Sequence, residues 1–172
     1  MPVSLLRYSQ PPISKSISPN ENHDKRMIFD VKLTHLQIVS SEHGAVLHMV
    51  KNIDSTFAGF GEIYFSTIAQ GQRKDWRRHN IATAQLAVPI GRVRFALFDD
   101  RGGSHSNGAT WDVTLGRDHY FLLTIPPGVW FAIQNVGTSE ALIANCSSMP
   151  HDPTSIDRRP LSTVDIPYDW RD

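Results

Sequence analysis

The sequence predicts an all-β protein built of antiparallel strands, either a sandwich or a jelly roll. Many short segments are rich in Val, Ile, Phe and Tyr, the residues that suit a pleated, half-buried surface. Residues that form turns separate these segments at close intervals. No long stretch shows the 3.6-residue periodicity of an amphipathic helix. Short strands at regular spacing are typical of sandwiches and jelly rolls.

The predicted strands follow one another along the chain with turns between them. They cover residues 28–40, 45–53, 61–68, 84–88, 92–98, 110–116, 120–126, 129–135 and 140–146. The turns cover residues 41–44, 57–61, 99–108, 125–128 and 135–140. In the segment 92–98, Val93, Phe95 and Leu97 share one face because side chains alternate along a strand.

We expect residues 27–172 to form a single domain, since 172 residues fit one hydrophobic core. A leader rich in Pro and Ser, residues 1–26, precedes it. The segment after residue 150 is Pro-rich and polar. It is predicted to wrap over the surface and to end by docking Trp170.

Charge and cysteine content narrow the function classes. The chain has 17 basic and 17 acidic residues, so no net field attracts nucleic acid or an anionic membrane. The single cysteine, Cys146, cannot form an internal disulfide, which favours a cytoplasmic location. The N-terminus lacks the pattern of a signal peptide, and no apolar run is long enough to span a bilayer.

Two spaced motifs indicate the type of β fold. Gly71 is followed by five residues and then by Arg77-Arg78-His79, and Ala84 and Gly91 come after fixed intervals. Further on, the sequence Pro126-Pro127-Gly128 precedes Phe131 and Asn135. These spacings resemble the first and second motifs of the cupin family. The resemblance implies an antiparallel double-stranded β-helix, the cupin jelly roll.

The metal-ligand positions of those motifs are mostly lost. Metal-binding cupins use two His, a Glu and a later His, where this chain has Arg77, His79, Ala84 and Phe131. A guanidinium stays protonated and cannot coordinate a cation. The sequence therefore predicts no metal site and no cofactor, and it argues against a metal-dependent dioxygenase.

Longer segments carry a more specific resemblance, from about Gly61 to Trp170. They are "KDWRRH", "VPIGRVRFALFDDR", "LGRDHYFLLTIPPGVW" and "IPYDW". They resemble the dTDP-4-dehydrorhamnose 3,5-epimerase family. The likeness is closer to a branch whose pattern is Lys-Gly-Trp-His-x-His followed by "IPPGVW", "DDR" and "ANC".

The resemblance implies a nucleotide-sugar substrate and proton transfer next to a 4-keto group through an enolate. Such chemistry needs a base, an acid on the other face and a cation for the enolate. The family's catalytic His position is Arg77, its Lys position falls on or near Ala84, and its Tyr position falls near Ala144. The later His is Phe131. The resemblance also implies a homodimer paired through the strand-like segment 29–39.

His79 and Arg77 are the predicted catalytic residues, since strand alternation puts both on one face. The ordinary pKa of histidine suits a general base, and an adjacent guanidinium would lower it. A pocket histidine that only donates and accepts hydrogen bonds is the alternative. Trp76 is predicted to point the opposite way, into the core.

Lys74, Arg73, Arg94 and Tyr120 are the predicted substrate-binding residues. The first three belong to a basic segment, residues 73–101, whose seven basic and three acidic residues leave a balance of +4. A diphosphate suits forked guanidinium donors, whereas a solvated strand face is the simpler alternative. Tyr120 could replace the missing acid. Two function classes remain open, namely a dTDP-sugar isomerase or epimerase and a non-catalytic sugar- or sugar-nucleotide-binding cupin.

Overall fold

The computed structural model describes residues 27–170, and their secondary structure is nearly all β. This confirms the predicted all-β class. The strands are β1 (Lys32–His35), β2 (Ile38–Ser41), β3 (Gly44–Leu47), β4 (Glu62–Ile68), β5 (Arg73–His79), β6 (Ala84–Ile90), β7 (Arg92–Asp99), β8 (Thr110–Gly116), β9 (Phe121–Ile125), β10 (Val129–Asn135), β11 (Ala141–Ser147) and β12 (Ile156–Arg159). A short 3-10 helix, Pro153–Ser155, precedes β12. None of the described segments is a helix of the length and apolarity needed to cross a bilayer.

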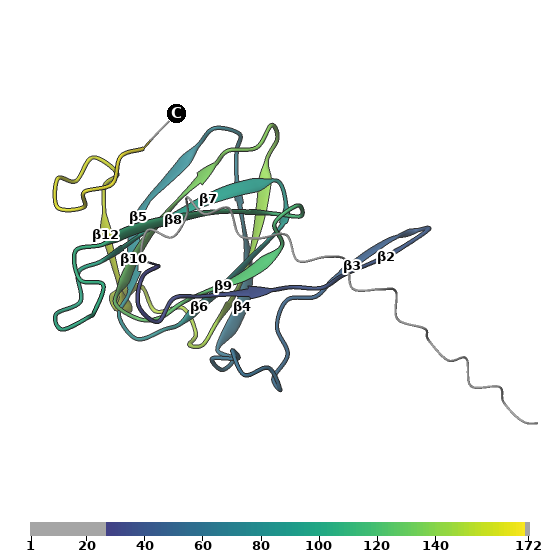
Figure 1. The fold of residues 1–172 in the computed structure, drawn as a ribbon, viewed down its shortest axis with the longest axis horizontal. Helices are drawn as coiled ribbons and strands as arrows, with labels where there is room; N and C mark the ends of the chain where they lie inside the picture. Colours follow the sequence, from purple (N-terminus) through teal and green to yellow (C-terminus); the bar gives the residue numbers. More distant parts are fainter. Residues whose placement is uncertain (1–26, 171–172) are drawn as a thin grey trace, which may run out of the picture.

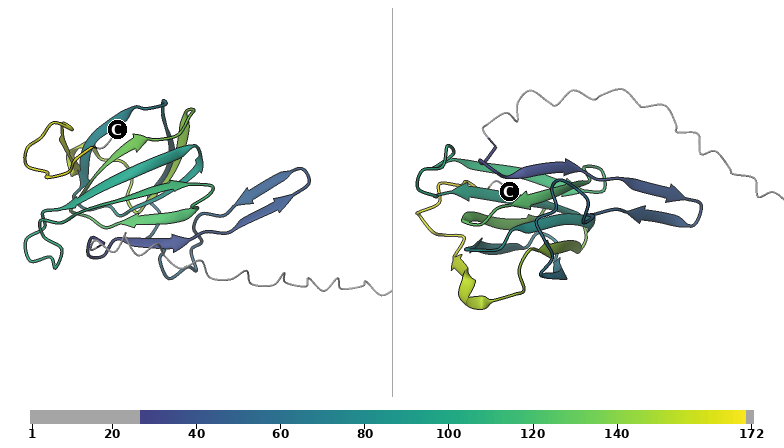
Figure 2. Two further views of the ribbon diagram at one scale, coloured as in Figure 1. Left: turned by 45° about the horizontal axis from the view of Figure 1, so that its top comes forward. Right: turned by 90° about the horizontal axis from the view of Figure 1, so that it is seen from below.

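Ten of these strands form two five-stranded antiparallel sheets. The first sheet has the order β1-β9-β6-β11-β4 and the second has the order β12-β5-β10-β7-β8. The two sheets lie face to face and enclose an interior, as Figures 1 and 2 show. This arrangement is the cupin jelly roll that the motif spacing predicted.

The main hydrophobic core fills the space between the sheets. Leu86, Leu123 and Ile143 come from the first sheet, and Phe95 and Ile133 come from the second. Alternation along each strand directs one set of side chains into this interior and the other set outward. The inward side chains of β7 are the three that the sequence predicted to share a face.

A second apolar cluster covers the outer face of the second sheet. Trp76 and Trp130 are each 1% exposed there, beneath Tyr168 and Trp170 of the C-terminal segment. The ring of Trp76 lies 5.9 Å from that of Tyr168 and 5.8 Å from that of Trp170. The tail therefore docks Trp170 as predicted, and Trp76 is a core residue.

The structure differs from the predicted strands at four places. One is β5, which lies outside the predicted strand ranges because residues 73–79 are mostly charged. The expected strand 28–40 is divided into β1 and β2, and the segment 45–53 is extended only as far as Leu47. Strand β12 lies in a segment that was predicted as a wrapping tail, because its pattern "IDRR" has little apolar content. The predicted leader, residues 1–26, lies outside the described residues.

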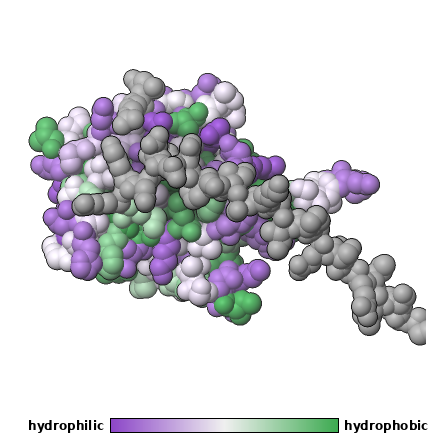
Figure 3. All heavy atoms as spheres, in the orientation of Figure 1, coloured by the Kyte–Doolittle hydropathy of each residue, from purple (hydrophilic) through white to green (hydrophobic). Residues whose placement is uncertain are grey.

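Strands β2 and β3 form a two-stranded hairpin that projects from the jelly roll (Figure 1). Val39 and Val46 are paired across it and are 44% and 58% exposed. The far end of the hairpin is hydrophilic (Figure 3). An isolated hairpin of this kind is marginally stable in water without further packing.

The packing of Trp76 gives a first prediction. Trp76→Ala should lower the free energy of unfolding by about 3–5 kcal/mol, because the cavity would lie under the docked tail. Urea unfolding followed by fluorescence measures this change. Phe60→Ala, which removes a side chain that is 66% exposed, should change the same quantity by less than about 0.5 kcal/mol. Equal losses in the two variants would contradict the assignment of Trp76 to the core.

Candidate functional site

A bulge in β5 decides which side chains face the interior. Opposite β10, Arg77 pairs with Phe131 and Lys74 pairs with Ile133, so β5 holds one extra residue between these pairs. Residues directly opposite each other share a face of the sheet. Because Phe131 and Ile133 belong to the core between the sheets, Arg77 and Lys74 also face inward. The extra residue is the physical reason that two inward residues are three positions apart.

Arg77 and His79 lie together on this inner wall beside the ring of Phe131. The guanidinium carbon of Arg77 is 5.7 Å from the centre of that ring, and the His79 ring is 5.8 Å from it. The buried Nε of Arg77 has no hydrogen-bond partner among the described residues. The site thus holds a half-buried arginine whose Nε–H is unsatisfied within the described residues.

The environment of His79 keeps its imidazole neutral. Burial, and then the charges of Arg77, His151 and Arg158, lower the pKa of His79 to about 4. Burial and the charge of Arg158 likewise lower the pKa of Arg77, and burial and Arg77 lower that of Lys74. Several cations thus approach one another in the same place.

The turn after β9 fixes the backbone of His79. Gly128 closes this Pro-Pro-Gly turn with a φ of +83°, a conformation that L side chains rarely adopt. Its N–H donates a hydrogen bond of 2.8 Å to the carbonyl oxygen of His79. The second sequence motif therefore positions a residue of the first.

Tyr64 on β4 is a site residue that the sequence did not single out. Its hydroxyl accepts a hydrogen bond from the Nδ2 of Asn145 on β11, and its position raises the pKa of Arg77 electrostatically. The Oδ1 of Asn145 is buried without a partner among the described residues. The Tyr position was expected near Ala144; the inward residue there is Asn145, and the phenol comes from the neighbouring strand. The alternation in "EIYFSTI" could have indicated an inward Tyr64.

Arg158 is the second residue that sequence reasoning missed. It lies opposite Arg77 where β12 pairs with β5, so both side chains are on the inner side of the second sheet. Its guanidinium makes no hydrogen bond or ion pair with any of residues 27–170. A strand made of "IDRR" carries no pattern that predicts this pairing.

The predicted binding residues Arg73 and Arg94 lie on the opposite face of the second sheet. Gln134 is the cross-strand partner of both, and its Oε1 accepts a hydrogen bond of 3.3 Å from Arg94. The guanidinium of Arg73 lies 5.3 Å from the ring centre of Trp170 in the outer cluster. The expected grouping with Arg77 is therefore corrected, because the bulge reverses the alternation between Arg73 and Arg77.

Tyr120 is also separated from His79. It is 6% exposed in a third apolar cluster with Leu36, Ala87 and Leu122, on the outer face of the first sheet. Burial raises the pKa of its phenol. The prediction that Tyr120 lies near the pocket is corrected, because it precedes β9 on the side turned away from the interior.

The rest of the basic segment is mostly paired with carboxylates. Arg78 contacts Asp157 at 2.6 Å and Asp100 at 3.1 Å, both on the outer side of the second sheet. Arg101 contacts the buried Asp99 at 2.8 Å. Of the seven basic residues predicted as a cluster, Lys74 and Arg77 are the pair that the structure brings to the inner wall with His79.

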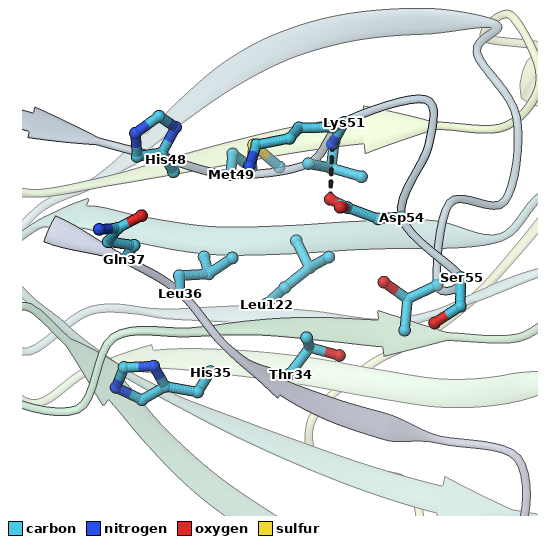
Figure 4. A pocket seen from close by; sticks show the side chains of 12 residues that line it. Thr34, His35, Leu36, Gln37, His48, Met49, Lys51, Asp54, Ser55 and Leu122 are labelled. Carbon is cyan, nitrogen blue, oxygen red and sulfur yellow. Dashed lines mark hydrogen bonds between the residues drawn. The ribbon is translucent and has the colours of Figure 1, made fainter. Parts of the chain in front are cut away.

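A cavity of about 270 Å³ lies away from this wall, between β1 and the loop that follows the hairpin (Figure 4). Leu36, Leu122 and Met49 form its apolar lining, with Lys51 and His48 at its edge. It sits over the outer face of the first sheet, so it is separate from the Arg77–His79 group.

The inner wall provides a neutral imidazole, a phenol and a group of cations. Residues 27–170 contain no cluster of three His, Cys, Asp or Glu that could hold a metal ion. The donor set therefore suits an anionic ligand and the movement of a proton between His79 and a bound molecule.

Comparison with known proteins gives several matches, although no protein-family model matches the chain. A dTDP sugar isomerase from Desulfovibrio desulfuricans G20 is 40% identical, with a TM-score of 0.81, over 83% of this chain and 92% of that one. A probable low-salt glycan biosynthesis epimerase, Agl13 of Haloferax volcanii, is 26% identical over 83% of this chain and 94% of its own length.

A third match concerns the fold alone. The dTDP-4-dehydrorhamnose 3,5-epimerase of Elizabethkingia anophelis NUHP1 is 14% identical, with a TM-score of 0.71. The match covers 86% of this chain and 84% of the epimerase chain.

The donor set also gives a prediction about metal. Untagged protein purified without chelator should hold no stoichiometric transition metal, because Arg77, Ala84 and Phe131 stand at three of the four motif ligand positions. Elemental analysis by mass spectrometry measures this. One Fe, Zn, Mn or Ni per chain would show that ligands other than the motif positions hold an ion.

Proposed function

The chain belongs to the dTDP-4-dehydrorhamnose 3,5-epimerase-like family of cupins, in the branch of dTDP-sugar isomerases and epimerases, and on this premise we propose that it acts on a dTDP-4-keto-6-deoxy sugar. The reaction is a proton transfer through an enolate. One observation carries the proposal. Arg77 and His79 lie beside the same ring, that of Phe131, on the inner wall, and the phenol of Tyr64 interacts electrostatically with Arg77.

His79 is the base in this proposal. Its pKa of about 4 leaves the imidazole neutral at pH 7, so a ring nitrogen can accept a proton. The C–H bond next to the ketone breaks, the proton moves to His79, and the electron pair moves onto the ketone oxygen. No metal or organic cofactor takes part in this step.

Arg77 is the cation that stabilises the developing enolate oxygen or binds the diphosphate. Its guanidinium lies beside the ring of Phe131 and makes no ion pair with a carboxylate among residues 27–170, so it can donate a hydrogen bond to a substrate oxygen. A preorganised cation in a site that excludes water stabilises developing charge strongly. Lys74, on the same wall, is a further contact for the anionic substrate.

Tyr64 is the proton donor in this proposal, in place of Tyr120. It belongs to the first sheet, whereas His79 belongs to the second, so a sugar between them presents different faces to the two groups. An acid and a base on opposite faces are what inversion at a carbon requires. Asn145 orients the hydroxyl of Tyr64 through its hydrogen bond.

A non-catalytic sugar- or sugar-nucleotide-binding protein is the second candidate. The observation that favours it is Arg77 itself, which stands where the family has its catalytic His and whose guanidinium cannot serve as a base. In that case His79 and Tyr64 would bind the sugar by hydrogen bonds alone.

Solvent exchange separates the two candidates. In heavy water, the wild-type protein should incorporate deuterium at the carbon next to the ketone of a dTDP-4-keto-6-deoxy sugar, since enolate formation exchanges that proton. His79→Asn should abolish this exchange and leave nucleotide binding nearly unchanged, because the amide keeps hydrogen-bonding capacity but cannot take the proton. Mass spectrometry of the recovered sugar measures the exchange.

Two further variants complete the experiment. Arg77→Ala should weaken dTDP binding by about ten- to a hundredfold, the expected loss of a charged hydrogen bond. Tyr64→Phe should permit exchange but slow the formation of an inverted product. Binding without exchange across several keto sugars would support the binding protein and contradict the enzyme.

We further propose that two copies of the chain pair through the β2–β3 hairpin. The exposed pair Val39 and Val46 requires cover, and the outward face of the edge strand β4 exposes Ile63 and Phe65 by 52% and 62%. One molecule thus has two exposed apolar regions, one on the β2–β3 hairpin and one on the outer face of β4. A twofold axis allows each copy to cover the other in the same way.

The dimer is tested by light scattering at micromolar concentration. The wild type should have the mass of a dimer, and Val46→Asp should shift it to the monomer because the new carboxylate would be buried. Val164→Asp, at a position that is 94% exposed in the tail, should remain dimeric. A monomeric wild type would contradict the proposal.

A further inference from the structure

We propose that Arg158 on β12 is a substrate-positioning residue, which forms one anion site with Arg77 and binds the diphosphate of the substrate between the two guanidinium groups. The inference rests on the proposed function and adds the C-terminal strand to the site. Neither residue is joined to a carboxylate by any ion pair among residues 27–170.

The pairing of β12 with β5 places the two guanidiniums on the same side. Arg158 is directly opposite Arg77, and Asp157 is directly opposite Arg78. Cβ atoms of residues paired in this way are about 4.5–5.5 Å apart. The two long side chains can therefore reach one anion together.

Two adjacent cross-strand pairs of β5 and β12 differ in charge: one joins a cation to an anion, and the other joins two cations. On the outer side, Arg78 and Asp157 form an ion pair of 2.6 Å, which fixes the register of β12. On the inner side, the neighbouring pair consists of two cations. Like charges directly opposite each other destabilise a sheet, so the inner pair needs an anion to offset the repulsion.

The partner that fits is a diphosphate. It carries more than one negative charge, and its oxygens accept forked hydrogen bonds from guanidinium groups. Arg77 is partly buried beside the ring of Phe131, whereas Arg158 is exposed to solvent. The anion would thus bind on the solvent side of Arg77, with the sugar directed toward His79.

Occupancy of this site controls the basicity of His79. The charged or titratable groups that face His79 are Arg77 on its own strand, Arg158 on β12 and His151 in the preceding loop. Together with burial they hold its pKa near 4, well below the ordinary value of about 6.5. A bound diphosphate neutralises the two arginines and raises this pKa, so the substrate strengthens the base that acts on it.

The lowered pKa of His79 makes the stability of the folded protein depend on pH. A depressed pKa means that the unfolded chain binds more protons than the free folded protein between about pH 4 and pH 6.5. The contribution of His79 to stability is therefore complete above that window and is lost as the pH falls through it. By reciprocity, anything that raises the pKa of His79 binds more tightly when His79 is protonated.

The experiment uses the full chain, with dTDP and inorganic pyrophosphate as probes. Arg158→Gln should weaken the binding of both by about ten- to a hundredfold in calorimetry. NMR titration of the His79 ring, assigned with His79→Asn, should show two changes. The pKa of His79 should rise in free Arg158→Gln, and dTDP should raise it more in the wild type than in the variant.

Matched controls make the result specific. Arg92→Gln removes an exposed guanidinium that pairs with Asp118 away from the site, and it should change neither binding nor the His79 titration. Arg158→Lys keeps the charge but not the fork, so it should retain the low pKa of His79 and bind less tightly than the wild type.

The experiment gives different results if the role of Arg158 is wrong and if the proposed function is wrong. If Arg158→Gln binds both probes as tightly as the wild type and His79 titrates unchanged, the role of Arg158 is overturned and the proposed function stands. If the wild type binds pyrophosphate through Arg158 but does not bind dTDP, the anion site stands and the nucleotide-sugar function fails. A wild type that binds neither probe overturns both.

Discussion

The pairing of β5 with β10 is the constraint on which the site depends. One extra residue in β5 changes the alternation of its side chains, so Lys74, Arg77 and His79 face the interior while Trp76 faces the tail. A regular strand would have placed Arg73 with Arg77 and would have turned Lys74 outward. The bulge thus divides a strand with four basic residues into an inner face, which carries Lys74, Arg77 and His79, and a structural face that packs against the tail.

The structural face holds the C-terminal segment, and that segment in turn reaches the site. Trp76 and Trp130 pack beneath the tail, and the guanidiniums of Arg78 and Arg159 lie 4.7 and 4.5 Å from the ring centre of Trp130. Trp130 also donates a hydrogen bond of 2.9 Å to Asp100. These outer contacts keep β12 against β5, so the packing of one face determines what the other face presents.

The inner wall brings several cations close together around His79. Arg77 and Lys74 have lowered pKa values, first because they are buried and then because they lie near other cations. Among residues 27–170 neither Arg77 nor Lys74 makes an ion pair with a carboxylate, although the charge of Asp75 raises the pKa of Arg77. The repulsion between these cations is free energy that an anionic ligand can release. Natural sequences break local rules in this way mainly at functional sites.

The sequence by itself determined the fold class, the motif glycines at the turns and the opposite faces on which Trp76 and His79 lie, because these follow from alternation and fixed spacing along the chain. Tertiary structure alone decided which residues from other strands lie around Arg77 and His79. Tyr64 and Arg158 come from strands far away in the chain, and their approach depends on which strands pair and in which register. The face on which Arg73 lies depends on one bulge, which reflects packing against β10 and leaves no local signal in the sequence.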